Sequence, residues 1–584
     1  MRRILPLLPS LMLALALSPP PILAQEPAAE GSGSPAGESA AEPSGELFID
    51  RVDVNVINVD VYVTDRQGEP VTGLTATDFE VFENGRQVTI SNFYSIQDRK
   101  LVAAGTLAPE EAPAEAGSPE PLAEPAEQGL PEDQRLSLIV YVDNLNIRPH
   151  NRRRVLQDVR SFLRRELTRE DRVMLATFER ALHVRVPFTT DAERVVEALF
   201  EVDELSGLGV HAESERRDVL RQIEDAQSGG EALMWAETYA ESVRNDLHFT
   251  IDALREIVSS LAGLPGRKAL LYVSDGVPMI AGEDVFYAVE QGFQNTGALT
   301  RLYSFDSSRR FEELAAHANG NRVSFYTIDA AGLRVHSSAD AQSFQADRAG
   351  GASHIDSIRT RNLQTPLQML AEHTGGTAII NQNRVEKALE RVAADFRNFY
   401  SLGYSPGHSG DGRYYRIEVR LKDRGKGWDV RHREGYRDKP AAAQMTDGVL
   451  AALNFPHYSN PLDLELSFGE GQRREDGHFL VPVNLKIPIR SLTLIPRGEV
   501  YEANASLYVA AMDDRGWISE VQQTPLPVQV RRDDLDEALE KEYVYTVQIL
   551  LRSGEQKVAV GVRDEVTASN SFVTRTVFLA ATRR

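Results

Sequence analysis

The chain has 584 residues, 42% of them hydrophobic, which is enough for several folded cores. Its 64 basic and 86 acidic residues give a formal net charge of −22. This charge excludes a protein whose main function is to bind nucleic acid, because a phosphate backbone requires a basic surface. The sequence contains no cysteine, so the chain forms no disulfides and is not a lipoprotein.

The first 24 residues have the layout of an export signal. Arg2 and Arg3 form a basic start, an apolar run extends from Ile4 to Leu17, and Ala24 precedes the expected cleavage position. An uncleaved membrane anchor is the alternative. It is disfavoured because the apolar run is shorter than the roughly 20 residues that span a bilayer. We therefore expect a secreted or periplasmic protein with no membrane span after cleavage.

Changes in composition and periodicity divide the rest of the chain. Alternating β-branched residues predict β structure, whereas stretches rich in Pro, Glu and Ala predict disordered linkers. Long apolar strands that alternate with helices predict an α/β domain, and a final series of short strands predicts a β-sandwich. The expected parts are a disordered linker at residues 25–46, an N-terminal β module at 47–98, an acidic Pro-rich linker at 99–133, the α/β domain at 134–400, a β segment at 401–439 and a C-terminal β-sandwich at 445–584.

The α/β domain is expected to contain a doubly wound, mainly parallel sheet, because its strands are nearly continuous apolar runs. The clearest runs are residues 136–142, 172–178, 268–274 and 323–329. A helix is predicted over residues 249–261, which Gly263 and Pro265 follow. The β module is too small to be stable alone. We therefore expect it to pair with the segment at 401–439 in one small β-sandwich, into which the α/β domain is inserted. The rival arrangement places that segment in the C-terminal sandwich.

Carboxylates follow three of the predicted parallel strands. They are Asp143, Asp275 and Asp329. Open α/β sheets bind their ligands at the carboxyl ends of the strands. Carboxylates with neighbouring hydroxyls at such an edge are also able to hold Mg²⁺ through oxygen ligands and water.

Several segments together resemble the von Willebrand factor type A family, in its exported bacterial form. The resemblance runs from Phe48 to Arg437 and includes the segment Tyr272-Val273-Ser274-Asp275-Gly276. It implies a Rossmann-like α/β fold, a metal-ion-dependent adhesion site and a function in protein binding or adhesion. The other matching segments are residues 71–74, 78–85, 264–271, 370–376, 400–406 and 435–436.

The chain departs from the family at that site. The family uses Asp-x-Ser-x-Ser after the first strand, a Thr from a later loop and an Asp after a central strand. Asp143 and Asp275 are kept, but Leu145 and Ile147 stand at the two Ser positions, and the loop around residues 207–216 contains no Thr. With Asn146 the two aspartates form a degenerate set, for which we expect no cofactor or only weak Mg²⁺ binding. The alternative is that the two aspartates cap loops and helix N-termini.

These observations lead us to expect a binding protein and no enzyme. The histidines, His408 among them, lack metal-ligand spacing and are expected at the surface. No sequence pattern of a serine nucleophile or a P-loop is present, so no catalytic residue is predicted. The alternatives are a structural component of the cell envelope and, disfavoured by the missing ligands, a metal-dependent enzyme. The expected partner is an unidentified protein, bound by Asp143, Asn144, Asn146 and Asp275 and by long loops at residues 277–319 and 333–362.

Overall fold

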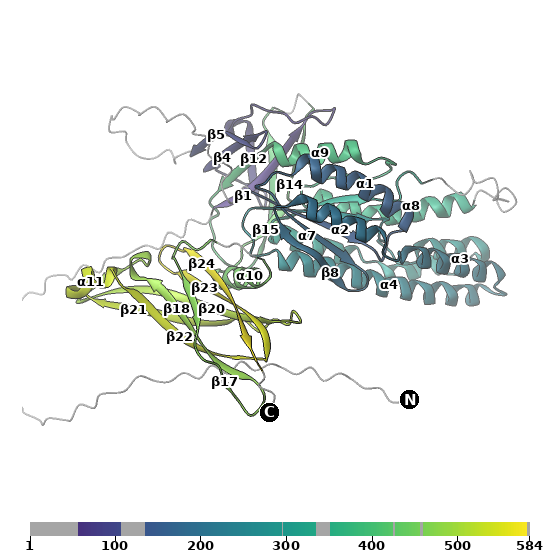
Figure 1. The fold of residues 1–584 in the computed structure, drawn as a ribbon. Helices are drawn as coiled ribbons and strands as arrows, with labels where there is room; N and C mark the ends of the chain where they lie inside the picture. Colours follow the sequence, from purple (N-terminus) through teal and green to yellow (C-terminus); the bar gives the residue numbers. More distant parts are fainter. Residues whose placement is uncertain are drawn as a thin grey trace, which may run out of the picture. The chain divides into compact units, whose positions relative to one another are not determined.

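The computed structural model describes residues 56–106, 135–294, 296–334, 351–423, 427–455 and 459–580, which belong to two compact units (Figure 1). The first unit comprises Asn55–Pro456, and the second contains His457–Arg584. The predicted export signal, the linker at 25–46 and most of the linker at 99–133 lie outside the described residues. None of the helices in the described ranges combines the length and apolar character that a bilayer span requires.

A six-stranded, mostly parallel sheet lies at the centre of the first unit. Its order is β11-β10-β9-β6-β7-β8, and every neighbouring pair is parallel except β7 and β8. All residues of β6 and β9 are buried, as expected for strands covered on both faces. The expected mainly parallel α/β sheet is confirmed. The strands are β6 (Leu136–Asp143), β7 (Arg172–Phe178), β8 (Leu182–Thr189), β9 (Arg267–Ser274), β10 (Val323–Asp329) and β11 (Ala378–Ile379).

Helices cover both faces of this sheet (Figure 1). Apolar side chains of α1, α2 and α9 join alternate residues of β6 and β9 in one core cluster. On the other face, α7 and α8 pack against β10. The helices are α1 (Pro149–Glu166), α2 (Ala192–Asp203), α3 (Gly209–Asp225), α4 (Gly229–Ser260), α5 (Glu283–Phe293), α6 (Ala298–Arg301), α7 (Ser308–Gly320), α8 (Gly351–His373) and α9 (Glu386–Arg397).

The helical content exceeds the sequence prediction. Residues 207–216 were expected to form a loop, but α3 begins at Gly209, and α4 has 32 residues where a helix was expected only over 249–261. The stripe that buries α4 against α5 consists of Ala232, Ala236 and Ala240, whose small side chains give a weak apolar signal. The predicted long loops at 277–319 and 333–362 are also wrong in part, because they contain α5, α6, α7 and the start of α8.

Strands that precede the parallel sheet in the chain pair with strands that follow it, and together they form two antiparallel sheets. Their orders are β14-β1-β12-β4-β5 and β15-β13-β2-β3. A shared core cluster includes Val61 and Val81 from the N-terminal part and Leu402 and Val419 from the part after α9. The strands are β1 (Ile57–Thr64), β2 (Phe79–Glu83), β3 (Arg86–Val88), β4 (Asn92–Gln97), β5 (Lys100–Thr106), β12 (Phe399–Tyr404), β13 (Tyr414–Leu421), β14 (Asp429–His432) and β15 (Gly435–Arg437).

Two boundaries differ from the prediction. Residues 100–106 were assigned to a linker but form β5, which pairs with β4 through a two-residue turn. Asp98 and Arg99 of this turn both have positive φ, 46° and 65°. The usual sequence signal for such a turn is Asn or Gly, and neither residue occurs in it. Residues 445–454, assigned to the C-terminal sandwich, belong to helix α10 (Ala441–Asn454), which packs against α4 within the first unit.

Over residues 459–580, the second unit consists of antiparallel strands and short helical turns. Its sheets are β16-β18-β17, with β22 beside β18, and β19-β20-β23-β24, with β21 beside β20. Buried and partly exposed residues alternate along all ten positions of β18, and both sheets contribute to one core cluster. The strands are β16 (Glu465–Phe468), β17 (Gln472–Arg473), β18 (Phe479–Pro488), β19 (Ile495–Arg497), β20 (Val500–Asp513), β21 (Gln522–Arg531), β22 (Glu542–Leu551), β23 (Gly554–Asp564) and β24 (Asn570–Leu579), with the short helix α11 (Leu535–Leu539).

Candidate functional site

The candidate site lies where the strand order of the parallel sheet reverses. The chain proceeds from β6 to β7 on one side and from β9 to β10 on the other, so the reversal falls between the neighbours β6 and β9. Asp143 is the last residue of β6, and Asp275 directly follows β9. Ligands of open α/β sheets bind in the crevice at this reversal. Two of the sequence-predicted carboxylates therefore reach the expected place.

Asp143 is completely buried, and its carboxylate receives hydrogen bonds from protein donors. The hydroxyl of Tyr272 donates to Oδ2 at 2.6 Å, and Nδ2 of Asn146 donates to the same oxygen at 2.9 Å. The backbone N–H of Asn146 donates to Oδ1 at 3.1 Å. Burial raises the pKa of Asp143, although the hydrogen bonds from Tyr272 and Asn146 oppose that rise. The carboxylate thus organises the loop that follows β6.

Thr250 of α4 takes part in this loop, and sequence reasoning missed it. Nδ2 of Asn146 also approaches Oγ1 of Thr250 at 3.1 Å, and that hydroxyl donates to the carbonyl of Asp246 at 3.1 Å. Thr250 lies in the middle of a helix, 104 residues after Asn146. No loop motif marks it, and only the fold brings its hydroxyl to the sheet edge.

Asp275 holds the start of helix α1. Its Oδ2 accepts hydrogen bonds from the backbone N–H of Arg148 at 3.0 Å and from Nε of Arg148 at 3.1 Å. Nδ2 of Asn151 lies 2.9 and 3.0 Å from the two carboxylate oxygens. Burial raises the pKa of Asp275, and the contacts with Asn151 and Arg148 oppose it. Asp275 therefore caps a helix N-terminus, as in the alternative interpretation of the sequence.

The third carboxylate, Asp329, is engaged in the same way at the end of β10. Nε2 of Gln364 donates to its Oδ2 at 2.8 Å, and Nη2 of Arg334 donates to its Oδ1 at 3.1 Å. Arg334 also donates to the backbone carbonyl of Asp275. This guanidinium therefore connects the loops after β9 and β10 through hydrogen bonds.

Asn144 has a structural role. Its Oδ1 accepts a hydrogen bond from the buried guanidinium of Arg152, and its Nδ2 donates to the carbonyl of Ser206 at 2.8 Å. Arg152 also donates to the carbonyls of Asp203 and Leu205. Asn144 is completely buried, so it pins the segment between α2 and α3 and is not available to a partner, contrary to the prediction.

The residues present do not fit a divalent cation. Leu145 and Ile147, which stand at the family's serine positions, are buried and apolar, and Ile147 belongs to the main core cluster. The guanidinium of Arg148 contacts the carboxylate of Asp275 and brings a positive charge to this edge of the sheet. Mg²⁺ would have to displace the hydrogen bonds of both aspartates and find its remaining oxygen ligands elsewhere.

Exposed side chains occur at the Arg148–Asp275 pair and on two segments that contact this edge of the sheet. The side chain of Arg148 is 44% exposed. Val210 and Leu333 are 53% and 59% exposed. Val210 follows Gly209, which packs so closely against the carbonyl of Ile147 that a side chain would not fit there. Leu333 precedes Arg334, whose guanidinium donates to the carbonyl of Asp275. Besides Arg148, the two segments that contact this edge each carry an exposed apolar side chain, Val210 and Leu333.

His408, predicted at the surface, is 19% exposed and lies in a cluster of ionisable side chains at the segment between β12 and β13. Its Nδ1 lies 2.8 Å from Oδ2 of Asp438, and its Nε2 lies 3.2 Å from Oε2 of Glu83. The ring stacks on Tyr415 at 3.6 Å between ring centroids. Asp411 completes a set that has the composition of a metal site. Both ring nitrogens, however, already face carboxylates, which favours a protonated imidazolium over a metal ligand.

No family model matches the chain, and no curated protein matches it. Solved structures are similar to parts of it. An aerotolerance-related membrane protein from Bacteroides fragilis NCTC 9343 is 12% identical over 45% of this chain and 98% of its own, with a TM-score of 0.22. The conserved hypothetical protein BatB from Bacteroides thetaiotaomicron is 11% identical over 44% and 96%, with a TM-score of 0.19. A mutant of the PilB minor pilin from Streptococcus sanguinis is 11% identical over 58% and 86%, with a TM-score of 0.23.

Proposed function

We propose that this chain is an exported protein-binding protein, in which a von Willebrand A-like domain with a degenerate metal site engages a protein partner at the carboxyl edge of its parallel sheet. The observation that carries the proposal is the place of the Arg148–Asp275 pair at the reversal of strand order, where sheets of this kind bind ligands. The guanidinium brings a positive charge to this edge without a bound ion.

The composition of the edge supports a protein as the partner. Arginine is enriched among the residues that dominate binding energies at protein interfaces, and apolar side chains around it exclude water when a partner docks. Arg148, Val210 and Leu333 offer this combination on three separate segments. Two NH₂ groups of the Arg148 guanidinium remain beyond the Nε that contacts Asp275, which suits a carboxylate on the partner.

Photo-crosslinking in cells tests the site. A photoreactive residue is placed at Val210 or at Leu333, with Val184 as the matched control, because Val184 is 50% exposed on β8 at the far edge of the same sheet. We expect one shared partner at Val210 and Leu333 that is absent at Val184. The same products at all three positions, or none at the two edge positions, would rule out a partner site here.

Export is a separate part of the proposal and rests on the signal-like start from Arg2 to Ala24. Mass spectrometry of the mature protein should find an N-terminus near Gln25 in the periplasm or the medium. Protein in the cytoplasm that retains Met1 would overturn this part and leave the sheet-edge site untouched.

A further inference from the structure

Strand β22 lies at one edge of a sheet in the second unit. It pairs over all ten of its residues with β18, and over residues 459–580 no other strand pairs with it. The strand contains neither proline nor glycine, and its ladder with β18 has no shift of register. An edge strand leaves alternate N–H and C=O groups without a strand partner, so a long and regular one is a template for a further strand.

The other long edge strands of the described ranges carry features that disfavour such pairing. β5 and β8 are irregular, because their ladders with β4 and β7 contain register shifts. In β21, Pro525 and Pro527 have no N–H groups, which suits an edge that does not pair further. Beside β24, the backbone N–H of Phe572 donates to the carbonyl of Ser459, and β24 also contacts β16.

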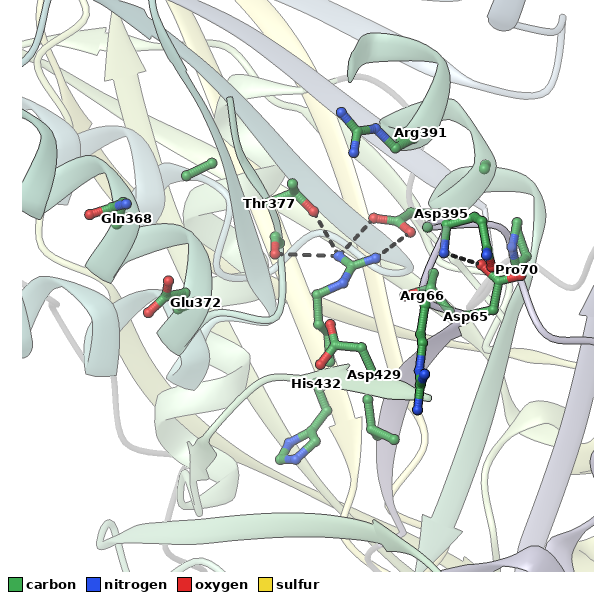
Figure 2. A pocket seen from close by; sticks show the side chains of 18 of the residues that line it. Asp65, Arg66, Pro70, Gln368, Glu372, Thr377, Arg391, Asp395, Asp429 and His432 are labelled. Carbon is green, nitrogen blue, oxygen red and sulfur yellow. Dashed lines mark hydrogen bonds and ion pairs between the residues drawn. The ribbon is translucent and has the colours of Figure 1, made fainter. Parts of the chain in front are cut away.

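Two more edge strands, β11 and β14, line a cavity of about 820 Å³ in the first unit (Figure 2). They are only two and four residues long. Nη1 and Nη2 of Arg431 on β14 donate to the carboxylate of Asp395 at 2.9 and 2.7 Å, and Nη1 also donates to the carbonyl of Gly376 at 3.3 Å. Polar groups of these edges are thus engaged within the chain. Among the described edges, β22 is the long one without such protection.

The side chains of β22 suit an antiparallel copy of the same strand. If two copies are centred on Val547, this residue faces its own counterpart. Thr546 then faces Gln548, so that two polar side chains meet, and Tyr545 faces Ile549, so that two apolar side chains meet. The remaining pairs are Val544 with Leu550, Tyr543 with Leu551 and Glu542 with Arg552.

The outermost of these pairs brings opposite charges together. Glu542 contacts Lys486 at 3.0 Å and Arg552 contacts Asp513 at 3.1 Å. The side chains of Glu542 and Arg552 nevertheless remain 44% and 41% exposed, so both can be reached by a partner strand. A neighbouring register would place each of these charges opposite an apolar side chain. Charge complementarity therefore favours the register centred on Val547.

We propose that the second unit pairs with a second copy of this chain through β22, in an antiparallel ladder centred on Val547. The two copies are related by a two-fold axis and contribute the same surface, so the interface closes on itself and the assembly is a dimer. The backbone pairing supplies the affinity, and the facing side chains set the register. This interface is independent of the sheet-edge site around Arg148, and neither proposal depends on the other.

Engineered cysteines test the register, because the chain contains no cysteine of its own. The full chain is prepared as Thr546→Cys, Gln548→Cys and Leu550→Cys. Under mild oxidation, a mixture of the first two variants should form a disulfide-linked pair, since facing Cα atoms lie about 4.5–5.5 Å apart. A mixture of Thr546→Cys with Leu550→Cys is the matched control. Its cysteines are two residues out of register, beyond the roughly 7 Å that a disulfide spans. Equal crosslinking in the two mixtures, or none in the first, would overturn the proposal.

Sedimentation velocity of the unmodified full chain tests the dimer itself. At ~100 µM most of the chain should be dimeric if the dissociation constant is micromolar. Thr546→Lys should weaken the dimer about tenfold or more, because a lysine on an edge strand blocks pairing. Phe578→Lys is the matched control, since Phe578 is 72% exposed on β24, beside β16 and across the sheet from β22. Circular dichroism checks that both variants fold. A monomeric wild type, a dimer that survives Thr546→Lys, or one that Phe578→Lys abolishes would contradict the proposal.

Discussion

The guanidinium of Arg148 lies 3.1 Å from Oδ2 of Asp275, and the backbone N–H of the same arginine donates to that oxygen at 3.0 Å. One residue thus supplies both a helix N-terminus and a positive charge to an aspartate that the family resemblance marks as a metal-site residue. The aspartate that was expected to bind a metal cation is therefore paired with a cationic side chain of the protein itself.

Mg²⁺ binding should be weak or absent. The carboxylates of Asp143 and Asp275 are engaged with Tyr272, Asn151 and Arg148, and an octahedral ion would lose the oxygen ligands that Leu145 and Ile147 cannot provide. Calorimetric titration of the full chain with Mg²⁺ or Mn²⁺ should show millimolar affinity or none. Micromolar binding that is abolished by Asp143→Ala would contradict this prediction.

Removing the Tyr272 hydroxyl should destabilise the first unit. Tyr272→Phe keeps the ring contact with Tyr141 but deprives the buried Asp143 carboxylate of its shortest hydrogen bond. We expect the free energy of unfolding to fall by about 1–3 kcal/mol, the usual cost of leaving a buried polar group unsatisfied. Denaturant unfolding measures it, with Tyr303→Phe as the control because that side chain is 85% exposed. Equal effects of the two variants would speak against a structural role for the Tyr272–Asp143 contact.

The cluster around His408 should make stability depend on pH. Partial burial lowers the pKa of His408, but the hydrogen bonds with Asp438 and Glu83 outweigh it, so the pKa is raised in the folded protein. An unfolded histidine titrates near pH ~6.5. The stabilisation is therefore fully present below that pH and is lost as the pH rises through the folded pKa. Asp411 and the stacked Tyr415 also surround the ring, and the hydroxyl of Tyr436 lies 3.4 Å from Nε2.

The measurement compares the free energies of unfolding of the wild type and His408→Gln between pH 5 and pH 9. The advantage of the wild type should be largest at the acidic end of this range and should shrink toward the alkaline end. A difference that stays constant over the whole range would show that His408 contributes by packing alone.

Trimming the chain should reveal how its parts depend on one another. A version that starts at Gln134 lacks β1 and β4, which flank β12, and β2, which pairs with β13. It should expose apolar strands and aggregate, whereas a version covering residues 48–455 should unfold cooperatively. Size-exclusion chromatography and thermal unfolding distinguish them. A monomeric, fully stable version from Gln134 would show that the α/β part does not need the N-terminal strands.

The strands of the parallel sheet could be predicted from the sequence because burial on both faces leaves continuous apolar runs, as in β6 and β9. The aspartates at their ends followed from the same pattern. Helix α3 and the first half of α4 escaped prediction. On α4 the reason is that a stripe of alanines buries the helix without a strong apolar signal. The functional details escaped for a different reason. Thr250, and the partners of His408, come together only through contacts between distant segments.

The most direct test of the central claim measures capture of the partner that crosslinks at Leu333, with and without EDTA, in the wild type and in Arg148→Glu. The account predicts that the chelator leaves the crosslinking yield unchanged, since the edge carries its own cation, and that reversing the charge of Arg148 lowers it about tenfold or more. Arg153→Glu, an exposed arginine on the same helix, serves as the matched control and should leave the yield unchanged. A yield that EDTA abolishes, or that Arg148→Glu leaves intact, would contradict the claim.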